Sequence, residues 1–317
     1  MNIQQFQYIL AVAEFRHFEL ASEKCHITQS TLSTMISKFE DEIGFQIFDR
    51  KKKPVQITNE GLLIIEQLKL ITNNIDQLKE LAKEIKGEIN GNLSLSVIPT
   101  IAPFLLPIFL QDFASEFPNL NIVVREETTA EIQRKLKSRE LDIGIISIPI
   151  LDKELEEVKL YDEPFLFFDA GNSKSKNLSV ASVKLENLCL MEEGHCMRTQ
   201  ILQLCNENFR ISNSKLNFEF KAGSIDSLLR FVKAYNGTTL IPCLAAHNFS
   251  DLDKIHISNF TSPVPFRTVG LIVHRHFVKK KLLKSLEQMI TDKIAIILPQ
   301  NLIEGKMLNP VLLKHHL

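Results

Sequence analysis

The sequence predicts an α/β protein in which an all-α winged helix-turn-helix and one long helix precede two Rossmann-like subdomains. Short helical segments separated by a turn fill the first 58 residues, and an unbroken amphipathic helix with a heptad repeat follows them. From residue 89 onward strands alternate with helices, an order that builds parallel or mixed sheets covered by helices. We therefore divide the chain into 1–58, 59–88, 89–301 and 302–317, the last being a tail without an assigned role.

The composition is that of an ordinary globular protein with room for two or three hydrophobic cores. Of its 317 residues, 44% are apolar and 24% are charged, and the net charge of −1 gives no sign of a nucleic-acid partner. The N-terminal stretch has no basic region before its apolar residues, and no apolar run approaches the roughly 20 residues of a membrane span. We expect a cytoplasmic protein without a membrane partner, whose contacts with any nucleic acid come from a local cluster of residues.

The cysteine pattern argues against a structural disulfide framework and against a zinc cluster. A reducing compartment disfavours the first, and the five cysteines include no C-x-x-C pair for the second. No G-x-G-x-x-G or G-x-x-x-x-G-K-[ST] motif occurs, so we expect neither a nucleotide nor a metal cofactor. Each cysteine is taken first as a small buried hydrophobe. They are Cys25, Cys189, Cys196, Cys205 and Cys243.

The first 58 residues have the pattern of a helix-turn-helix. A short helix over Phe18–Cys25 is followed by the interruption "HIT" and by a second helix with Thr28 as its N-cap. The apolar face of the second helix is formed by Leu32, Met35, Ile36, Phe39 and Ile43. Its first turns place polar side chains away from that face, and these are expected to enter the major groove of DNA: Gln29, Ser30, Thr31 and Ser33.

Four consecutive cations, Arg50 to Lys53, follow the helix-turn-helix and are closed by Pro54 and the extended stretch "VQIT". This pattern predicts a β-hairpin wing. A charge run is more often a solvated loop. Beside a helix-turn-helix, however, we expect Arg50, Lys51 and Lys53 to contact the DNA backbone or minor groove, where counterion release supplies affinity.

Residues 59–88 predict one long helix, capped by Thr58, with two apolar rows at heptad spacing. An amphipathic helix packed on its own domain would show a similar face, but the strict repeat directly after a DNA-binding module favours pairing between two copies. We therefore expect a homodimer, and a homotetramer built from such dimers. The rows are Ile64, Ile71, Leu78 and Ile85, and Leu68, Ile75 and Ala82.

The rest of the chain supplies the alternating elements of two subdomains that could hold a ligand between them. Helices are expected at Phe104–Phe117, Ala130–Lys137, Arg198–Asn208 and Ile225–Tyr235. The strand candidates are "LSLSV", "NIVVREE", "LDIGIISI", "PFLFFDA", "LCLME", "LNFEFKAG", "TTLIP" and "TVGLIV".

The stretch "EEGHCMRTQILQLC" (Glu192–Cys205) carries two cysteines nine residues apart on what the sequence predicts to be one amphipathic helix. Nine residues of helix span about 13–14 Å, whereas a disulfide needs Cα atoms within about 7 Å. The two thiols are therefore either unrelated buried groups or the ends of a switch that unwinds the helix to close.

The N-terminal block resembles LysR-type transcriptional regulators along the whole of their helix-turn-helix signature. The resemblance rests on Phe6, on "TQSTLS" at the start of the second helix, on the Glu, Gly, Phe and Arg positions from Glu40 to Arg50, and on T-x-x-G at the end of the wing. One departure is Ser30, where the family usually has proline. The resemblance implies an effector half similar to periplasmic binding proteins, with double-stranded DNA and RNA polymerase as partners.

The effector half resembles the peroxide-sensing subgroup of that family, in Val97–Pro107, Asp162–Phe167, "EEGHCMRTQILQLC" and Phe266–Val273. In that subgroup hydrogen peroxide oxidises the first cysteine of the pair, the second resolves it into a disulfide, and a glutaredoxin- or thioredoxin-type reductant restores the thiols. The resemblance thus implies that Cys196 is peroxidatic and Cys205 resolving. It also implies peroxide-site roles for Thr100, Thr129, His195, Thr199 and Arg267, with Thr199 departing from the aspartate of the enterobacterial-type pattern.

These residue types suit the chemistry, because a thiolate attacks peroxide and a helix N-terminus favours an anion. We expect Cys196 at the start of its helix, with His195 and Arg198 adding positive charge and Thr100 holding the peroxide. The sulfenic acid that forms can condense with a second thiol. Cys205 is expected in the core until the disulfide forms, when its helix refolds. The remaining cysteines are expected to be structural.

Other functions remain open from the residues. A regulator of the same family could bind a small-molecule effector between its subdomains without redox chemistry. A thiol enzyme, such as a peroxidase or a cysteine hydrolase, is a further possibility, but the DNA-binding block argues against it and we expect no enzymatic activity. A secreted solute-binding protein would share the two-subdomain architecture, and the missing signal peptide argues against that class.

Overall fold

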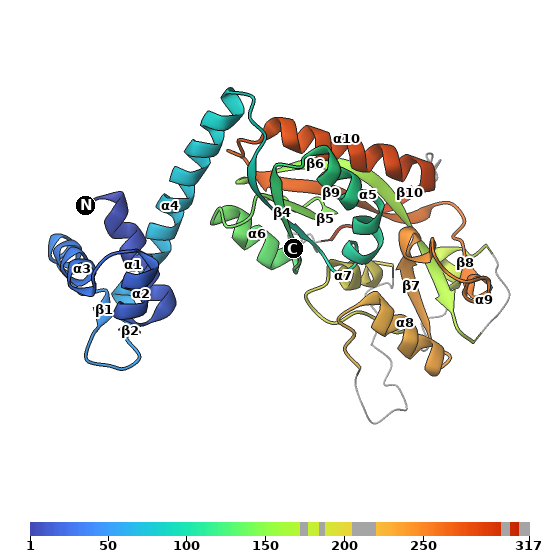
Figure 1. Ribbon diagram of the computed structural model, residues 1–317. Coiled ribbons are helices and arrows are strands. Elements are labelled where there is room, and N and C mark those ends of the chain that lie inside the picture. The colour runs from blue at the N-terminus through green and yellow to red at the C-terminus, as the bar shows by residue number, and fades with distance from the viewer. Residues whose placement is uncertain (172–176, 184–187, 205–219, 299–304, 311–317) are drawn as a thin grey trace. The chain divides into compact units, whose positions relative to one another are not determined.

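The computed structural model describes residues 1–171, 177–183, 188–204, 220–298 and 305–310, and the chain divides into two compact units (Figure 1). The first comprises Met1–Gly87 together with Ser138–Glu140, and the second comprises Glu88–Lys137 and Leu141–Leu317. Gly87 has a φ of +78°, a left-handed conformation in which glycine ends the long helix without strain. Among the described residues, no helix is long and apolar enough to span a membrane.

The first unit is a winged helix-turn-helix continued by a long helix, as the sequence predicts. Its elements are α1 (Ile3–Phe15), α2 (Phe18–Lys24), α3 (Gln29–Ile43), β1 (Phe48–Asp49), β2 (Gln56–Ile57) and α4 (Asn59–Ile85). Both predicted N-caps are present: Thr28 accepts from the Thr31 N–H, and Thr58 accepts from the Gly61 N–H at 2.9 Å. A Cβ at Gly61 would lie 2.4 Å from the Ile47 carbonyl oxygen, so glycine is required where α4 meets the wing.

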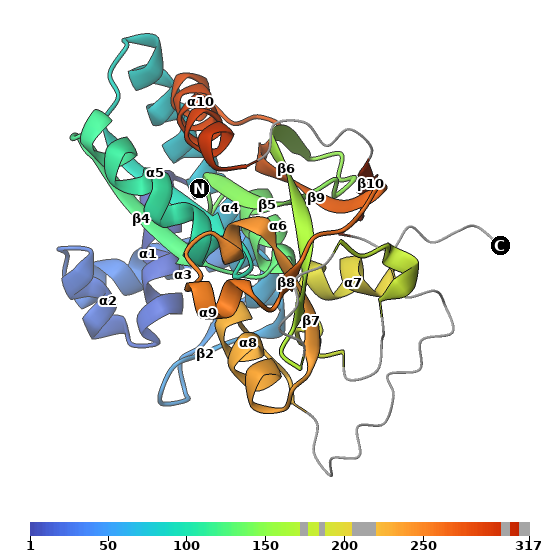
Figure 2. The ribbon, with the colours of Figure 1, turned by 90° about the vertical axis from the view of Figure 1, so that its right-hand side faces the viewer.

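The second unit is built on a mixed sheet with the strand order β4-β3-β5-β9-β6-β7 (Figure 2). β3 pairs in parallel with β4 and β5, whereas β9 is antiparallel to β5 and β6. The strands are β3 (Gly91–Val97), β4 (Leu120–Glu126), β5 (Ile143–Ile148), β6 (Leu155–Asp169), β7 (Thr238–Pro242), β8 (Ile257–Ser258), β9 (Val264–His274) and β10 (Gly305–Met307). Two predicted strands, "PFLFFDA" and "TVGLIV", are parts of the longer β6 and β9, which run through both subdomains.

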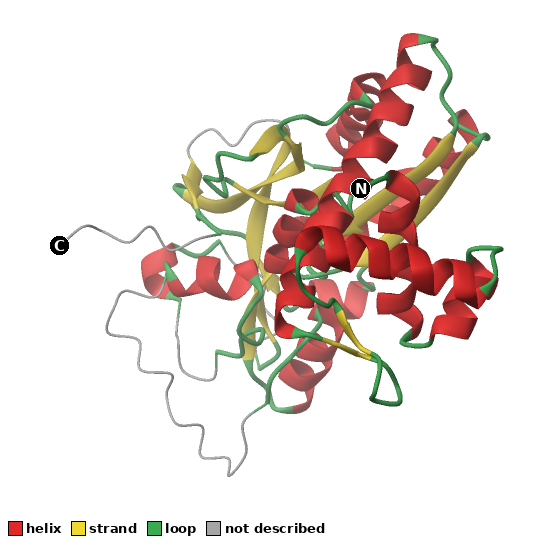
Figure 3. Cartoon of the chain, turned by 90° about the vertical axis from the view of Figure 1, so that its left-hand side faces the viewer, coloured by secondary structure: helices red, strands yellow, loops and turns green. Residues whose placement is uncertain are grey.

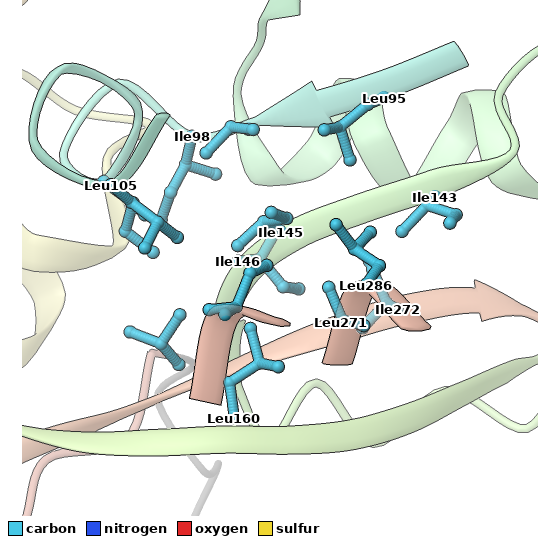
Figure 4. Close-up of a cluster of buried hydrophobic side chains, with 14 of the residues drawn as sticks. Leu95, Ile98, Leu105, Ile143, Ile145, Ile146, Leu160, Leu271, Ile272 and Leu286 are labelled. Carbon is cyan, nitrogen blue, oxygen red and sulfur yellow. The ribbon is translucent and has the colours of Figure 1, made fainter. Parts of the chain in front are cut away.

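Helices cover this sheet (Figure 3) and divide its apolar side chains between two cores. The first core joins β3, β5 and β9 to α5 (Ala102–Glu116), α6 (Thr129–Lys137) and α10 (Lys280–Ile297), and Figure 4 shows its tightly gathered aliphatic side chains. The second core joins the end of β6 and β7 to α7 (Cys196–Leu202) and α8 (Ile225–Ala234), while α9 (Asp251–Lys254) is short and exposed. Two cores confirm the predicted pair of subdomains.

Three sequence predictions in this unit need correction. The helix expected over Arg198–Asn208 begins at Cys196 and ends at Leu202, and Cys205 lies outside the described residues. The stretch "LCLME" is not a strand among the described residues. It makes isolated bridges, from Leu188 to Thr238 and from Met191 to Ala222, and no continuous ladder. The tail contributes β10, although the sequence assigned it no role. Most of the strand candidate "LNFEFKAG" lies outside the described residues.

Candidate functional site

Cys196 is the first residue of α7, and its side chain lies inside the second unit. Gly194, two residues earlier, has a φ of +96°, which a glycine adopts without strain as the chain turns into the helix. Cys196 is 7% exposed and packs with the first core, whereas the adjacent Met197 packs with the second. The thiol singled out by the sequence therefore lies where the two subdomains meet.

Burial dominates the electrostatics of this thiol and raises the pKa of Cys196 above its ordinary value. Three influences oppose it: the positive charge of Arg267, a hydrogen bond from the Thr129 hydroxyl, and the backbone N–H groups of Cys196 and Met197. Cys196 begins its helix as expected, and the backbone N–H groups there favour the anion, but in the reduced protein burial outweighs them. The thiol is held neutral beside groups that stabilise the thiolate once it forms.

A buried ion pair fixes Arg267 in this position. Its Nε and Nη2 atoms lie 2.8 and 2.7 Å from Oε2 of Glu163. Nη1 donates to the Thr100 hydroxyl at 2.9 Å, and Nη2 donates to the Thr100 carbonyl oxygen at 3.0 Å. The other carboxylate oxygen of Glu163 accepts from the Leu244 N–H at 2.8 Å. One guanidinium therefore links the surroundings of Cys196 to Thr100, two residues that are far apart in the sequence.

Of the predicted peroxide-site residues, the structure brings four together from four different segments. Thr100 follows β3, Thr129 begins α6, Cys196 begins α7 and Arg267 lies on β9. Their convergence needs both subdomains, since α6 belongs to the first core and α7 to the second.

The other predicted residues are placed differently. His195 precedes α7, with Nε2 3.7 Å from Oε1 of Glu192. Thr199 lies within α7, and no hydrogen bond among the described residues joins its side chain to Cys196. Arg198 donates to the Met191 carbonyl oxygen at 3.0 Å, so the cation acting on Cys196 is Arg267 rather than Arg198. The resolving residue of the prediction, Cys205, lies outside the described residues.

Sequence reasoning missed three residues that support the site. Glu163 anchors Arg267, and Tyr161, near both charges, has its pKa raised well above the ordinary value, chiefly by burial. Gln200 is fully buried on α7 and donates hydrogen bonds from Nε2. A carboxylate in the apolar stretch "DEPFLF" was the available signal, because a buried charge requires a partner. Among the described residues, no group of three or more His, Cys, Asp or Glu side chains could hold a metal ion.

The candidate DNA interface lies on the first unit. Gln29, Ser30 and Thr31 are exposed at the start of α3, as predicted, whereas Ser33 is half-buried and accepts from Nη1 of Arg50 at 2.9 Å. Arg50 also pairs with the buried carboxylate of Glu40 at 2.7 Å, so it ties the wing to α3. The exposed lysines of the wing are Lys51, Lys52 and Lys53, of which Lys52 donates to Gln56 at 2.9 Å. DNA contacts by these residues remain a prediction.

The long helix α4 uses its predicted apolar rows in two ways. Leu68 packs in the core of the first unit and Ile64 packs against that core. Further along, Ile71, Leu78 and Ile85 are exposed, Leu78 by 66% and Ile85 by 78%. An exposed apolar row of this kind is what a second helix would cover.

Two protein-family models together match most of the chain. The model described as "Bacterial regulatory helix-turn-helix protein, lysR family" matches residues 3–62, and "LysR substrate binding domain" matches residues 86–295. The chain belongs to the LysR family. The match joins the DNA-binding unit and the two-subdomain unit in the order that the sequence predicts.

This LysR-family protein is similar to OxyR proteins in sequence and in fold. It is 33% identical to the DNA-binding transcriptional dual regulator OxyR of Escherichia coli K12, over 86% of this chain and 89% of the relative. It is 28% identical to a Haemophilus influenzae protein named hydrogen peroxide-inducible genes activator, over 94% and 99%. A solved full-length OxyR variant from Pseudomonas aeruginosa has a TM-score of 0.69 and 28% identity, covering 92% of this chain and 98% of that chain. OxyR from Porphyromonas gingivalis has a TM-score of 0.61 and 27% identity, covering 69% and 100%.

Proposed function

We propose that this protein is a DNA-binding transcription regulator that senses hydrogen peroxide by oxidation of Cys196 and by a disulfide between Cys196 and Cys205. Relatives named OxyR and hydrogen peroxide-inducible genes activator align over most of the chain, which supports this class of function. For the sensing step, the observation that carries the proposal is the convergence of Arg267, the Thr129 hydroxyl and two backbone N–H groups on one buried sulfur. A thiol with a purely structural role needs no such set of anion-stabilising groups.

The first step is attack by the Cys196 thiolate on one oxygen of hydrogen peroxide. A sulfur–oxygen bond forms, the oxygen–oxygen bond breaks, and the departing hydroxide takes up a proton and leaves as water. Arg267 and Thr129 stabilise the anion from which the attack starts. The Thr100 hydroxyl accepts from Arg267 and so has its own hydrogen free to donate to a peroxide oxygen. Because burial keeps the resting thiol neutral, the reaction draws on a minor thiolate fraction.

The second step is attack by the Cys205 sulfur on the sulfenic acid of Cys196. The sulfur–sulfur bond forms and the sulfenic oxygen leaves as water, with one proton from the Cys205 thiol. In this step part of α7, which begins at Cys196 and ends at Leu202, unwinds to bring the Cys196 sulfur to Cys205. A glutaredoxin- or thioredoxin-type thiol reductant supplies the two electrons that reverse the switch.

The regulator acts in the cytoplasm on promoter DNA and works as an assembly. The polar start of α3 and the wing lysines bind DNA, and the exposed row Ile71, Leu78 and Ile85 pairs two copies through α4. Two such dimers form a homotetramer, and disulfide formation changes the contacts between effector units and with RNA polymerase. The protein consumes peroxide once per switch and is not an enzyme.

Mass spectrometry of peroxide-treated protein tests the proposal directly. A peptide that contains Cys196 linked to Cys205 is expected in the wild type and is absent from Cys196→Ser. Cys189→Ser is the matched control, because Cys189 contacts β7 through its main chain, with its N–H 2.8 Å from the Thr238 carbonyl oxygen. Free thiols at both positions after treatment would contradict the redox mechanism.

A DNA footprint separates this function from the small-molecule alternative. Reduced and oxidised wild-type protein are expected to protect different lengths of promoter DNA, whereas Cys196→Ser keeps the reduced pattern in peroxide. A normal peroxide response of the Cys196→Ser variant would instead favour an effector that binds between the subdomains without redox chemistry.

A further inference from the structure

The described part of the C-terminal tail is a strand beside the strand that carries Arg267. β10 (Gly305–Met307) pairs in parallel with residues 264–266 of β9, and the Leu308 N–H donates to the Phe266 carbonyl oxygen at 2.8 Å. Leu308 is fully buried in the second core. A Cβ at Gly305 would lie 2.6 Å from the Phe266 ring, so a larger residue there would displace this ring. The tail is therefore fixed one residue away from Arg267.

Two glutamine side chains join the same tail to α7. Nε2 of Gln203 donates to the Asn309 carbonyl oxygen at 2.8 Å, and its Oε1 accepts from the Asn309 N–H at 3.1 Å. Nε2 of Gln200 donates to the Leu308 carbonyl oxygen at 2.8 Å and to the Ser147 hydroxyl of β5 at 3.0 Å. The tail contributes only main-chain atoms to these bonds, so the glutamines recognise its path rather than its side chains.

Cys196 and Gln200 of α7 and its C-cap residue Gln203 lie on one face, because their spacings of four and three residues follow the helical repeat. A helix of seven residues is far shorter than the roughly 12–15 residues at which an isolated helix becomes marginally stable in water. Contacts with the rest of the fold must therefore hold α7 in its helical form. The hydrogen bonds of Gln200 and Gln203 are such contacts, on the face that carries the reactive sulfur.

We propose that residues 305–309 form a clasp that holds α7 in its reduced, helical position, and that Gln200 and Gln203 are positioning residues for the redox step. This inference rests on the proposed peroxide response and deepens it. Unwinding of α7 in the proposed second step breaks the bonds from Gln203 and Gln200 to the clasp. The clasp therefore opposes disulfide formation and favours return to the reduced form.

The clasp is expected to act on one chemical step and to spare the other. Attack on peroxide uses the sulfur and its immediate neighbours, none of which belongs to the clasp. Disulfide formation requires α7 to unwind. Weakening the clasp should therefore accelerate the second step without changing the first.

The first test is hydrogen–deuterium exchange of the reduced full-length protein. Gln203→Ala removes both bonds to Asn309, and amides of α7 are expected to exchange about tenfold faster, the effect of losing hydrogen bonds of ordinary net strength. Asn309→Ala is the matched control, since it keeps the main-chain atoms that Gln203 binds. Its α7 exchange is expected to equal that of the wild type. Equal exchange in Gln203→Ala and the wild type overturns the clasp.

The second test separates a positioning role from a structural one by rates. Disulfide formation in Gln203→Ala, measured by quenched thiol labelling, is expected to be about tenfold faster. If the reverse rate is unchanged, the equilibrium constant for disulfide formation also rises tenfold, and the reduction potential of the Cys196–Cys205 couple falls by about 30 mV. Sulfenic acid formation, measured in a Cys205→Ser background, is expected to be unchanged. A residue that only stabilises the fold would not separate these two rates.

The outcomes distinguish the clasp from the function on which it rests. Faster α7 exchange in Gln203→Ala without any Cys196–Cys205 disulfide in the wild type supports the clasp contacts and refutes the proposed redox mechanism. A disulfide that forms at the same rate in Gln203→Ala and the wild type leaves the redox mechanism intact and overturns the role of the clasp.

Discussion

Replacing Arg267 with methionine removes the charge that organises the site while keeping an unbranched side chain of similar length. Among the described residues, Glu163 then keeps the hydrogen bond from the Leu244 N–H at 2.8 Å, and Thr100 loses both of its bonds to the guanidinium. Because Glu163 is 0% exposed, the stranded carboxylate cannot be hydrated without opening the fold. The variant tests whether the contributions of Arg267 and Glu163 to stability are energetically coupled.

The expected cost follows from this burial. Removing one partner of a buried, hydrogen-bonded ion pair lowers the free energy of unfolding by about 3–5 kcal/mol. Glu163→Gln leaves the Arg267 cation buried and unpaired, and we expect it to lower the free energy of unfolding by a similar amount. The double variant Glu163→Gln with Arg267→Met removes both charges and should recover most of the loss, because a buried pair contributes little net stability relative to neutral side chains. The coupling energy between the two sites should exceed about 2 kcal/mol.

Urea unfolding of the reduced full-length variants measures the coupling, with the transition of the second unit followed by fluorescence of a label on that unit. A double variant whose loss equals the sum of the two single losses would refute the reasoning. Arg267→Met should also slow the oxidation of Cys196 near neutral pH, because loss of the cation raises the pKa of the thiol further. An unchanged oxidation rate would contradict that assignment.

The remaining predictions concern the thiols, the wing and the linker helix. Thr129→Val should slow the oxidation of Cys196 about tenfold, the effect of losing one hydrogen bond to an anion, and stopped-flow measurement with peroxide checks this. Burial, with a smaller contribution from Glu163, raises the pKa of Cys243 to about 11. The second unit should therefore lose about 2–3 kcal/mol as the pH rises from 9 toward 11, and Cys243→Ala should flatten that slope in urea unfolding. Lys51→Ala combined with Lys53→Ala should reduce the slope of log affinity for DNA against log salt by about two, and an unchanged slope would exclude these lysines from phosphate contact. Leu78→Asp should dissociate the α4 pair in analytical ultracentrifugation, whereas Leu252→Asp, at a position 78% exposed on α9, should not.

Local patterns were sufficient to predict the elements that depend on local physics. The caps Thr28 and Thr58 and the spacing of apolar residues located α3 and α4, since capping and amphipathicity act within one helix. Alternation and short apolar runs located β3, β5 and β7 for a similar reason. The family resemblance, carried by residues of the helix-turn-helix and by the Gly-His-Cys stretch, pointed to the set of residues around Cys196.

The arrangement of the site was decided by tertiary structure. Arg198 is two residues from Cys196 in the sequence, yet Arg267 supplies the charge, because β9 carries it across from the other end of the chain. The sign of the thiol pKa shift also depends on burial by both cores, which no local pattern reports. The end of α7 at Leu202 and the docking of the tail depend on hydrogen bonds across more than a hundred residues. The sequence by itself predicted which groups carry the chemistry, and only the packing of distant segments determined how deeply they are buried and which contacts hold them.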